Sequence, residues 1–158
     1  MVTYSLDTSC LINAWNKLYQ PDLFPSIWEH LDRLIQVETV VITEQVLFEI
    51  RKKDDDLSKW CAARKHLFRA IDNPLQNCLS QLMKRHRRIA AVGAGRNLAD
   101  PFVIALAQTF DPILAVVTEE DKGKETNPKI PYLCEQEGIR CTNFNGLLRE
   151  TSWRERSR

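Results

Sequence analysis

Four carboxylates fall at or near the ends of predicted strands and helices, and none has a basic residue directly beside it. They are Asp7, Glu49, Asp100 and Glu120. Carboxylates gathered in one cleft repel one another, so their pKa values rise when no cation is bound. A divalent cation removes this repulsion, and a set of hard oxygen ligands favours Mg²⁺ or Mn²⁺. If the fold brings these acids together, they can support metal-assisted hydrolysis, in which the cation acidifies a bound water.

Each acid also has a purely structural interpretation. Asp100 before Pro101 is typical of a helix N-cap followed by a first-turn proline, and Asp7 can cap the helix that follows it. Glu49 stands in the apolar segment 46–50, where a carboxylate costs free energy unless it has a partner, although it can also lie on the solvent face of the helix. The case for a site therefore depends on the conjunction of the acids.

Strand-like and helix-like segments alternate along the chain, which predicts an α/β domain with a central parallel sheet of four to five strands flanked by helices. Strands are expected at 2–6, 39–42, 113–117 and 140–142. Helices are expected at 10–18, from 26, and from an N-cap at Thr43 up to a break at 54–56. Further helices are expected at 58–70, 73–88, 102–109, 132–137 and 145–149, with 119–129 as a loop. Ligands bind at the carboxyl ends of parallel strands, which is where Asp7 and the acids after 113–117 fall. Residues 1–150 form the predicted domain, and 151–158 form a basic tail that we expect to be mobile.

Length and composition are those of a globular protein. The chain has 158 residues, of which 44% are hydrophobic and 27% charged, and these values exclude the disordered class. The net charge of +1 means that a nucleic acid would have to be bound by a local patch. The longest apolar run, 102–107, is too short for a membrane span, and the first residues lack the basic region of a signal peptide. Five cysteines without C-x-x-C spacing predict reduced thiols in a cytoplasmic protein.

The acidic segments resemble the ordered motifs of PIN domains, nucleases that include the VapC-type toxins of toxin–antitoxin pairs. The segments are Tyr-Ser-Leu-Asp-Thr-Ser at 4–9, Glu49, Ala-Asp-Pro-Phe-Val-Ile-Ala at 99–105 and Val-Val-Thr-Glu-Glu at 116–120. The similarity covers about residues 2–148. It implies a single PIN-like domain that acts as a Mg²⁺- or Mn²⁺-dependent endoribonuclease on RNA phosphodiester bonds. It also implies a single-stranded or structured RNA substrate, a protein antitoxin as partner, and a homodimer.

The resemblance assigns a role to each acid. Asp7, Glu49 and Asp100 would hold the metal directly or through water, and Glu120 would assist a second ion or orient the attacking water. Ser9, and less favourably Thr8, would hydrogen-bond Asp7 or a phosphate. Thr118 is placed with Ser9 among the residues that support the acids.

The last motif departs from the family pattern. The toxins usually carry Thr-x-Asp, whereas this chain has Thr118-Glu119-Glu120 followed by Asp121. Glu119, Glu120 and Asp121 are therefore all candidates for the fourth acid. The departure also leaves open a PIN-like module that has lost its metal site and only binds RNA or protein.

A phosphatase that forms an aspartyl-phosphate is a further alternative. Such enzymes also place an aspartate after the first strand, as Asp7 is placed here. They need a second aspartate two residues further on, and that position is Ser9. This difference argues against them.

Basic residues that could hold RNA lie at the end of the predicted helix 73–88 and in the loop before Asp100. They are Lys84, Arg85, Arg87, Arg88 and Arg96. Such residues can track a phosphate backbone into a cleft. Cations at the end of a helix also complement its dipole, so the cluster has a structural interpretation as well.

Overall fold

The computed structural model describes the chain except for residues 2, 88–98, 126 and 155–158. Its centre is a four-stranded parallel sheet with the order β2-β1-β3-β6. The strands are β1 (Tyr4–Leu6), β2 (Val40–Val41), β3 (Ala115–Val117) and β6 (Cys141–Thr142). The predicted α/β class and parallel sheet are confirmed.

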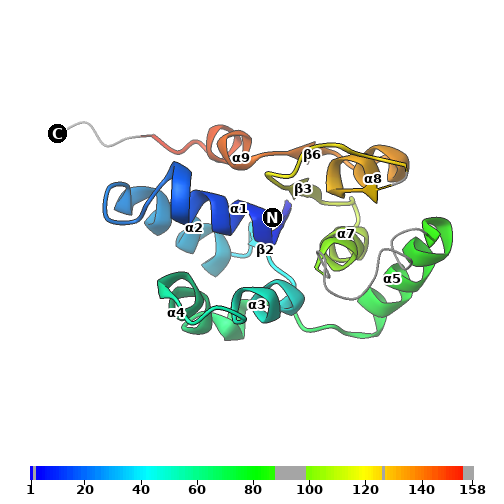
Figure 1. Ribbon diagram of the computed structural model, residues 1–158, viewed down its shortest axis with the longest axis horizontal. Helices are drawn as coiled ribbons and strands as arrows, with labels where there is room; N and C mark the ends of the chain where they lie inside the picture. The colour runs from blue at the N-terminus through cyan, green and yellow to red at the C-terminus, as the bar shows by residue number, and fades with distance from the viewer. Residues whose placement is uncertain (2, 88–98, 126, 155–158) are drawn as a thin grey trace.

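Helices flank the sheet, and a small antiparallel hairpin, β4 (Gly123–Lys124) with β5 (Asn127–Pro128), lies within the segment predicted as a loop. The helices are α1 (Thr8–Asn13), which continues as a π-helix η1 (Ala14–Leu18), α2 (Pro25–Gln36), α3 (Glu44–Ile50), α4 (Asp56–Ala62), the 3₁₀ turn η2 (Lys65–Leu67), α5 (Asn73–Arg85), α7 (Asp100–Gln108), α8 (Ile130–Glu137) and α9 (Phe144–Glu150). In Figure 1, α1 and α2 lie on one side of the sheet, and α7 lies on the other side with α5 packed outside it. Within the described part of the chain, no helix has the length and apolar character needed to cross a membrane.

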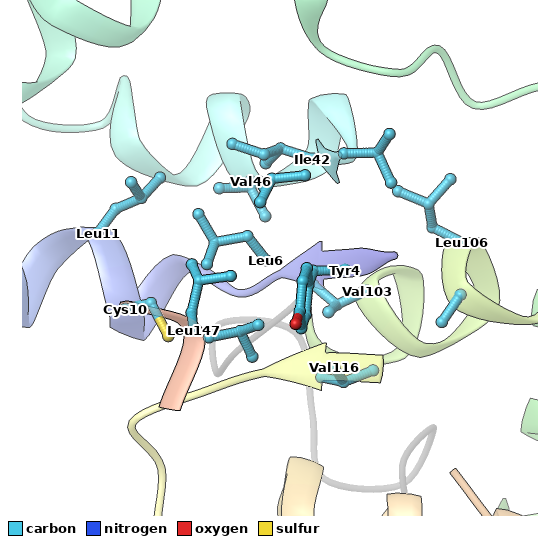
Figure 2. Packing of buried hydrophobic residues seen from close by; sticks show 14 of the residues in the cluster. Tyr4, Leu6, Cys10, Leu11, Ile42, Val46, Val103, Leu106, Val116 and Leu147 are labelled. Atoms are coloured by element: carbon cyan, nitrogen blue, oxygen red, sulfur yellow. The ribbon is translucent and has the colours of Figure 1, made fainter. Parts of the chain in front are cut away.

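The core forms where the strands meet the helices. Leu6 of β1 and Val116 of β3 are fully buried, as are Val46 of α3, Val103 of α7 and Leu147 of α9. Figure 2 shows these side chains gathered around β1. Strands buried on both faces need such continuous apolar runs, which explains why their sequences do not alternate. The packing fixes the strand ends against the start of α7.

Several helix boundaries differ from the prediction, most clearly those of α4 and α5. The helix expected at 58–70 ends at Ala62, because the Arg64 side chain donates to the Trp60 carbonyl at 2.9 Å and pairs with Asp32 of α2 at 2.6 Å. At α5 the N-cap is Asp72, whose carboxylate accepts the Leu75 amide at 3.0 Å, and the helix ends at Arg85.

Asp100 does not act as an N-cap. Ala99 occupies the cap position with helical dihedral angles and makes no side-chain cap bond, so Asp100 is the first residue of α7. The carboxylate of Asp100 is thereby free of a capping role. Asp7, in contrast, does cap α1, accepting the Thr8 amide at 2.7 Å.

Candidate metal centre

Three acids from distant parts of the chain meet at the carboxyl edge of the sheet. Asp7, Asp100 and Glu120 each offer a carboxylate oxygen, and these oxygens all lie within 4.8 Å of one another. Asp7 directly follows β1, Glu120 follows β3, and α7 packs on both strands so that its first residue reaches the same edge. Because β1 and β3 are paired in parallel, with Leu6 opposite Val117, their ends necessarily coincide.

Asp7 is held by a network of hydroxyl groups. Ser9 donates to its Oδ2 at 2.6 Å and Thr118 donates to the same oxygen at 2.9 Å. The two hydroxyls also accept backbone amides, Ser9 that of Glu119 at 2.9 Å and Thr118 that of Glu120 at 3.1 Å. The contact of Ser9 with Asp7 is the one that the sequence predicted. The network joins the end of β1 to the end of β3 and fixes the Asp7 carboxylate.

Burial and mutual repulsion raise the pKa values of the two innermost acids. Asp7 is 1% exposed, and its burial raises its pKa to about 6, although the Ser9 and Thr118 hydrogen bonds lower it. Asp100 is 8% exposed, and its pKa is raised more than that of Asp7. The larger cause is burial, and the second is repulsion from the negative charges of Asp7 and Glu120. Both shifts oppose the charged form, so a cation between these carboxylates would relieve an unfavourable arrangement.

The structure distinguishes the three candidates for the fourth acid. Glu119 turns away from the cluster and accepts the Phe144 amide at 2.8 Å, at the start of α9. Asp121 is exposed and pairs with Lys129 at 3.1 Å. Glu120 is the acid that joins Asp7 and Asp100, and one of its oxygens also accepts the Ile130 amide at 3.2 Å.

Glu49 lies beside the cluster but does not belong to the three-acid group found among the described residues. Its Oε2 accepts the Thr8 hydroxyl at 2.9 Å, and its Oε1 accepts the Ala99 amide at 2.7 Å. Its negative charge contributes to the raised pKa of Asp100. The contacts with Thr8 and Ala99 could not be predicted from the sequence, because they join residues 41 and 50 positions apart.

Of the basic residues expected to bind RNA, Arg85 already has a partner. Its guanidinium pairs with Glu137 of α8, whose side chain is only 8% exposed and also contacts His86 at 2.9 Å and Gln108 at 2.9 Å. Burial favours protonation of Glu137, but the hydrogen bonds from these three residues outweigh it and lower its pKa to about 2. The sequence analysis missed Glu137, which ties α5, α7 and α8 together.

The other basic candidates are exposed or lie outside the described residues. Lys84, in the last turn of α5, and Arg87 are exposed to solvent. Arg88 and Arg96 belong to the part of the chain that the structure does not describe. The tail begins in an ordered way, since the Thr151 hydroxyl donates to the Leu147 carbonyl at 2.7 Å.

This chain belongs to the family DUF4411, described as a domain of unknown function, whose sequence model matches residues 4–155. A search of curated proteins finds no match. The matched range contains the whole sheet and all three clustered acids. The family description assigns no activity, so the function is argued from the site.

Proposed function

We propose that this protein is a Mg²⁺- or Mn²⁺-dependent endoribonuclease with a PIN-like domain, which hydrolyses RNA phosphodiester bonds as the toxin of a toxin–antitoxin pair. The observation that carries the proposal is the meeting of Asp7, Asp100 and Glu120, with oxygens within 4.8 Å, at the sheet edge where parallel folds bind ligands. The motif resemblance supplies the substrate class and the homodimer, and the cytoplasmic location is proposed from the five cysteines without C-x-x-C spacing.

The donor set fits a hard divalent cation. All three ligands are carboxylates, which Mg²⁺ and Mn²⁺ prefer, and two of them are buried. In the described portion of the protein, no lysine, arginine or histidine forms an ion pair with any of them. Buried carboxylates without a basic partner either bind a proton or need a cation beside them. A divalent cation would meet that need.

The bound cation would supply an acidified water and stabilise negative charge on the phosphate. Asp7 and Asp100 would hold it, because their burial and their raised pKa values make the unneutralised pair unfavourable. Glu120 is half-buried, which leaves its carboxylate accessible to accept a proton from water or to hold a second ion. Ser9 and Thr118 orient Asp7 through their hydrogen bonds.

Cleavage of a labelled single-stranded RNA pool tests this function. The wild type, freed of any co-purified inhibitor, should cut RNA in Mg²⁺ or Mn²⁺ and stop when a chelator is added. Asp100→Asn should reduce cutting to the chelator level, and Asp121→Asn, an exposed acid from the same segment as Glu120, should cut like the wild type. A folded wild type that cuts no RNA, or an Asp100→Asn variant with full activity, would contradict the proposal.

A further inference from the structure

The Glu49 carboxylate bridges the residues that adjoin two of the clustered acids. Thr8 directly follows Asp7, and its hydroxyl donates to Glu49 Oε2 at 2.9 Å. Ala99 directly precedes Asp100, and its amide donates to Glu49 Oε1 at 2.7 Å. Both partners are buried. One side chain of α3 is therefore hydrogen-bonded to the start of α1 and to the start of α7.

This bridge spans the place where the site is electrostatically strained. Asp7 and Asp100 repel each other when ionised, and the repulsion acts to separate the end of β1 from the start of α7. Hydrogen bonds to a carboxylate are stronger than those between neutral groups. Two of them, one on each side of the Asp7–Asp100 gap, resist that separation. The added negative charge of Glu49 is the cost of the arrangement, since it also repels Asp100.

We infer that Glu49 is a positioning residue, which sets the distance between Asp7 and Asp100 by holding Thr8 and Ala99, rather than a ligand of the metal. The inference rests on the proposed function, because it assumes that Asp7 and Asp100 hold a cation. It replaces the ligand role that the motif resemblance assigns to Glu49. The reason is that the Glu49 carboxylate lies outside the three-acid group of the described residues, while its two oxygens join Thr8 to Ala99.

Three substitutions separate positioning from ligation. Glu49→Gln removes the charge but keeps an oxygen for the Ala99 amide and an NH₂ group that can donate to the Thr8 hydroxyl. Glu49→Ala removes both hydrogen bonds. Thr8→Val removes the hydroxyl and leaves the Glu49 carboxylate in place. A positioning role depends on the hydrogen bonds, whereas a ligand role depends on the carboxylate charge.

Titration calorimetry with Mn²⁺ measures the consequence for the site. We expect Glu49→Ala and Thr8→Val each to weaken Mn²⁺ binding by about 10- to 100-fold, as loss of an outer-shell partner does. Glu49→Gln should restore most of the wild-type affinity. The double variant Glu49→Ala with Thr8→Val should be little weaker than Glu49→Ala alone, since the two residues act through one contact.

Hydrogen exchange of the Ala99 amide in metal-free protein reads the bridge directly. The amide should exchange slowly in the wild type, Glu49→Gln and Thr8→Val, and faster in Glu49→Ala. Equal exchange in Glu49→Ala and wild type would overturn the inference. So would a Glu49→Gln variant that binds Mn²⁺ as poorly as Asp7→Asn, because that result identifies Glu49 as a ligand.

Failure of the proposed function gives a different result. If the folded wild type binds no Mn²⁺, the proposed function and the positioning role fail together. If the wild type binds Mn²⁺ and loses it on Asp7→Asn, while Glu49→Ala binds like the wild type, the positioning role alone fails.

Discussion

The Thr118 hydroxyl donates to Asp7 Oδ2 at 2.9 Å, although the two residues are 111 positions apart. The bond joins the ends of β1 and β3, and the same hydroxyl accepts the Glu120 amide. One threonine therefore connects two of the clustered acids, Asp7 through its side chain and Glu120 through its backbone. This links the sheet register, which aligns the strand ends, to the geometry of the candidate metal centre.

Thr118→Val removes a hydrogen bond that favours the ionised form of Asp7. We expect the Asp7 pKa to rise and the Mn²⁺ affinity to fall by about 10- to 100-fold. Thr109→Val is the matched control, because among the described residues the Thr109 hydroxyl bonds only to the Leu106 carbonyl, at 2.6 Å, at the end of α7. Calorimetry on both variants measures the effect. Equal affinities in the two variants would show that the Thr118 hydroxyl does not support the site.

The raised pKa of Asp7 predicts how stability depends on pH in a chelator. The ordinary value is 3.8 and the folded value about 6, so the native state binds the proton more tightly than the unfolded state. The stability is then fully present below about pH 4 and falls as pH rises through about 6, by about 3 kcal/mol for Asp7. Because the pKa of Asp100 is also raised, deprotonation of Asp100 lowers the stability further at higher pH.

Thermal unfolding in a chelator at several pH values measures this slope. Asp100→Asn should flatten its upper part, because an amide needs no proton to remain neutral, and Asp121→Asn should leave it unchanged. Saturating Mn²⁺ should raise the unfolding temperature most at neutral and higher pH, where the acids lose their protons most readily and the cation neutralises their charge. A metal-free wild type that gains stability from pH 5 to pH 8 would contradict the account of the acid cluster.

Glu137 predicts a pH dependence of the opposite sign at a distance from the acids. Its pKa falls from 4.5 to about 2 in the folded protein, so its contribution is present above about pH 4.5 and is lost as pH falls toward 2. Glu137→Gln should lower the free energy of unfolding at neutral pH by about 2 kcal/mol, since a buried charged acceptor is removed from Arg85.

Chemical denaturation of Glu137→Gln and Glu135→Gln provides the comparison. Glu135 is exposed and pairs with Lys122, so its replacement should change stability by less than about 1 kcal/mol. Both variants should bind Mn²⁺ like the wild type. A Glu137→Gln variant as stable as Glu135→Gln would show that the contacts among α5, α7 and α8 contribute little.

The parts of the fold that the sequence predicts are those set by local patterns. The helical spacing from residue 26 predicts α2, and the β-branched run at 39–42 predicts β2. The end of α4 at Ala62 could not be predicted in this way, because it depends on Arg64 reaching Asp32 of another helix. The hairpin within 119–129 was also missed, because its strands have two residues each and carry no periodicity.

For the site, the sequence predicted the candidate acids but not which of them lie together in the cluster and which contact backbone amides. Asp7 and Asp100 were found because strand ends and helix starts are visible in the sequence. The choice of Glu120 over Glu119 depends on the Phe144 amide, which the fold brings to Glu119 from 25 residues away. The hydrogen bond from the Ala99 amide to Glu49 could not be predicted either. Every residue except proline has a backbone amide, so the sequence does not indicate which amide a carboxylate will contact.

The central claim is that Asp7, Asp100 and Glu120 form one cation site, and Mn²⁺ titration calorimetry on the wild type, Asp7→Asn and Asp121→Asn tests it most directly. The account predicts that the wild type and Asp121→Asn bind Mn²⁺ with the same affinity, and that Asp7→Asn, folded by circular dichroism, gives no binding heat. A folded wild type without binding heat, or an Asp7→Asn variant that binds like the wild type, would contradict it.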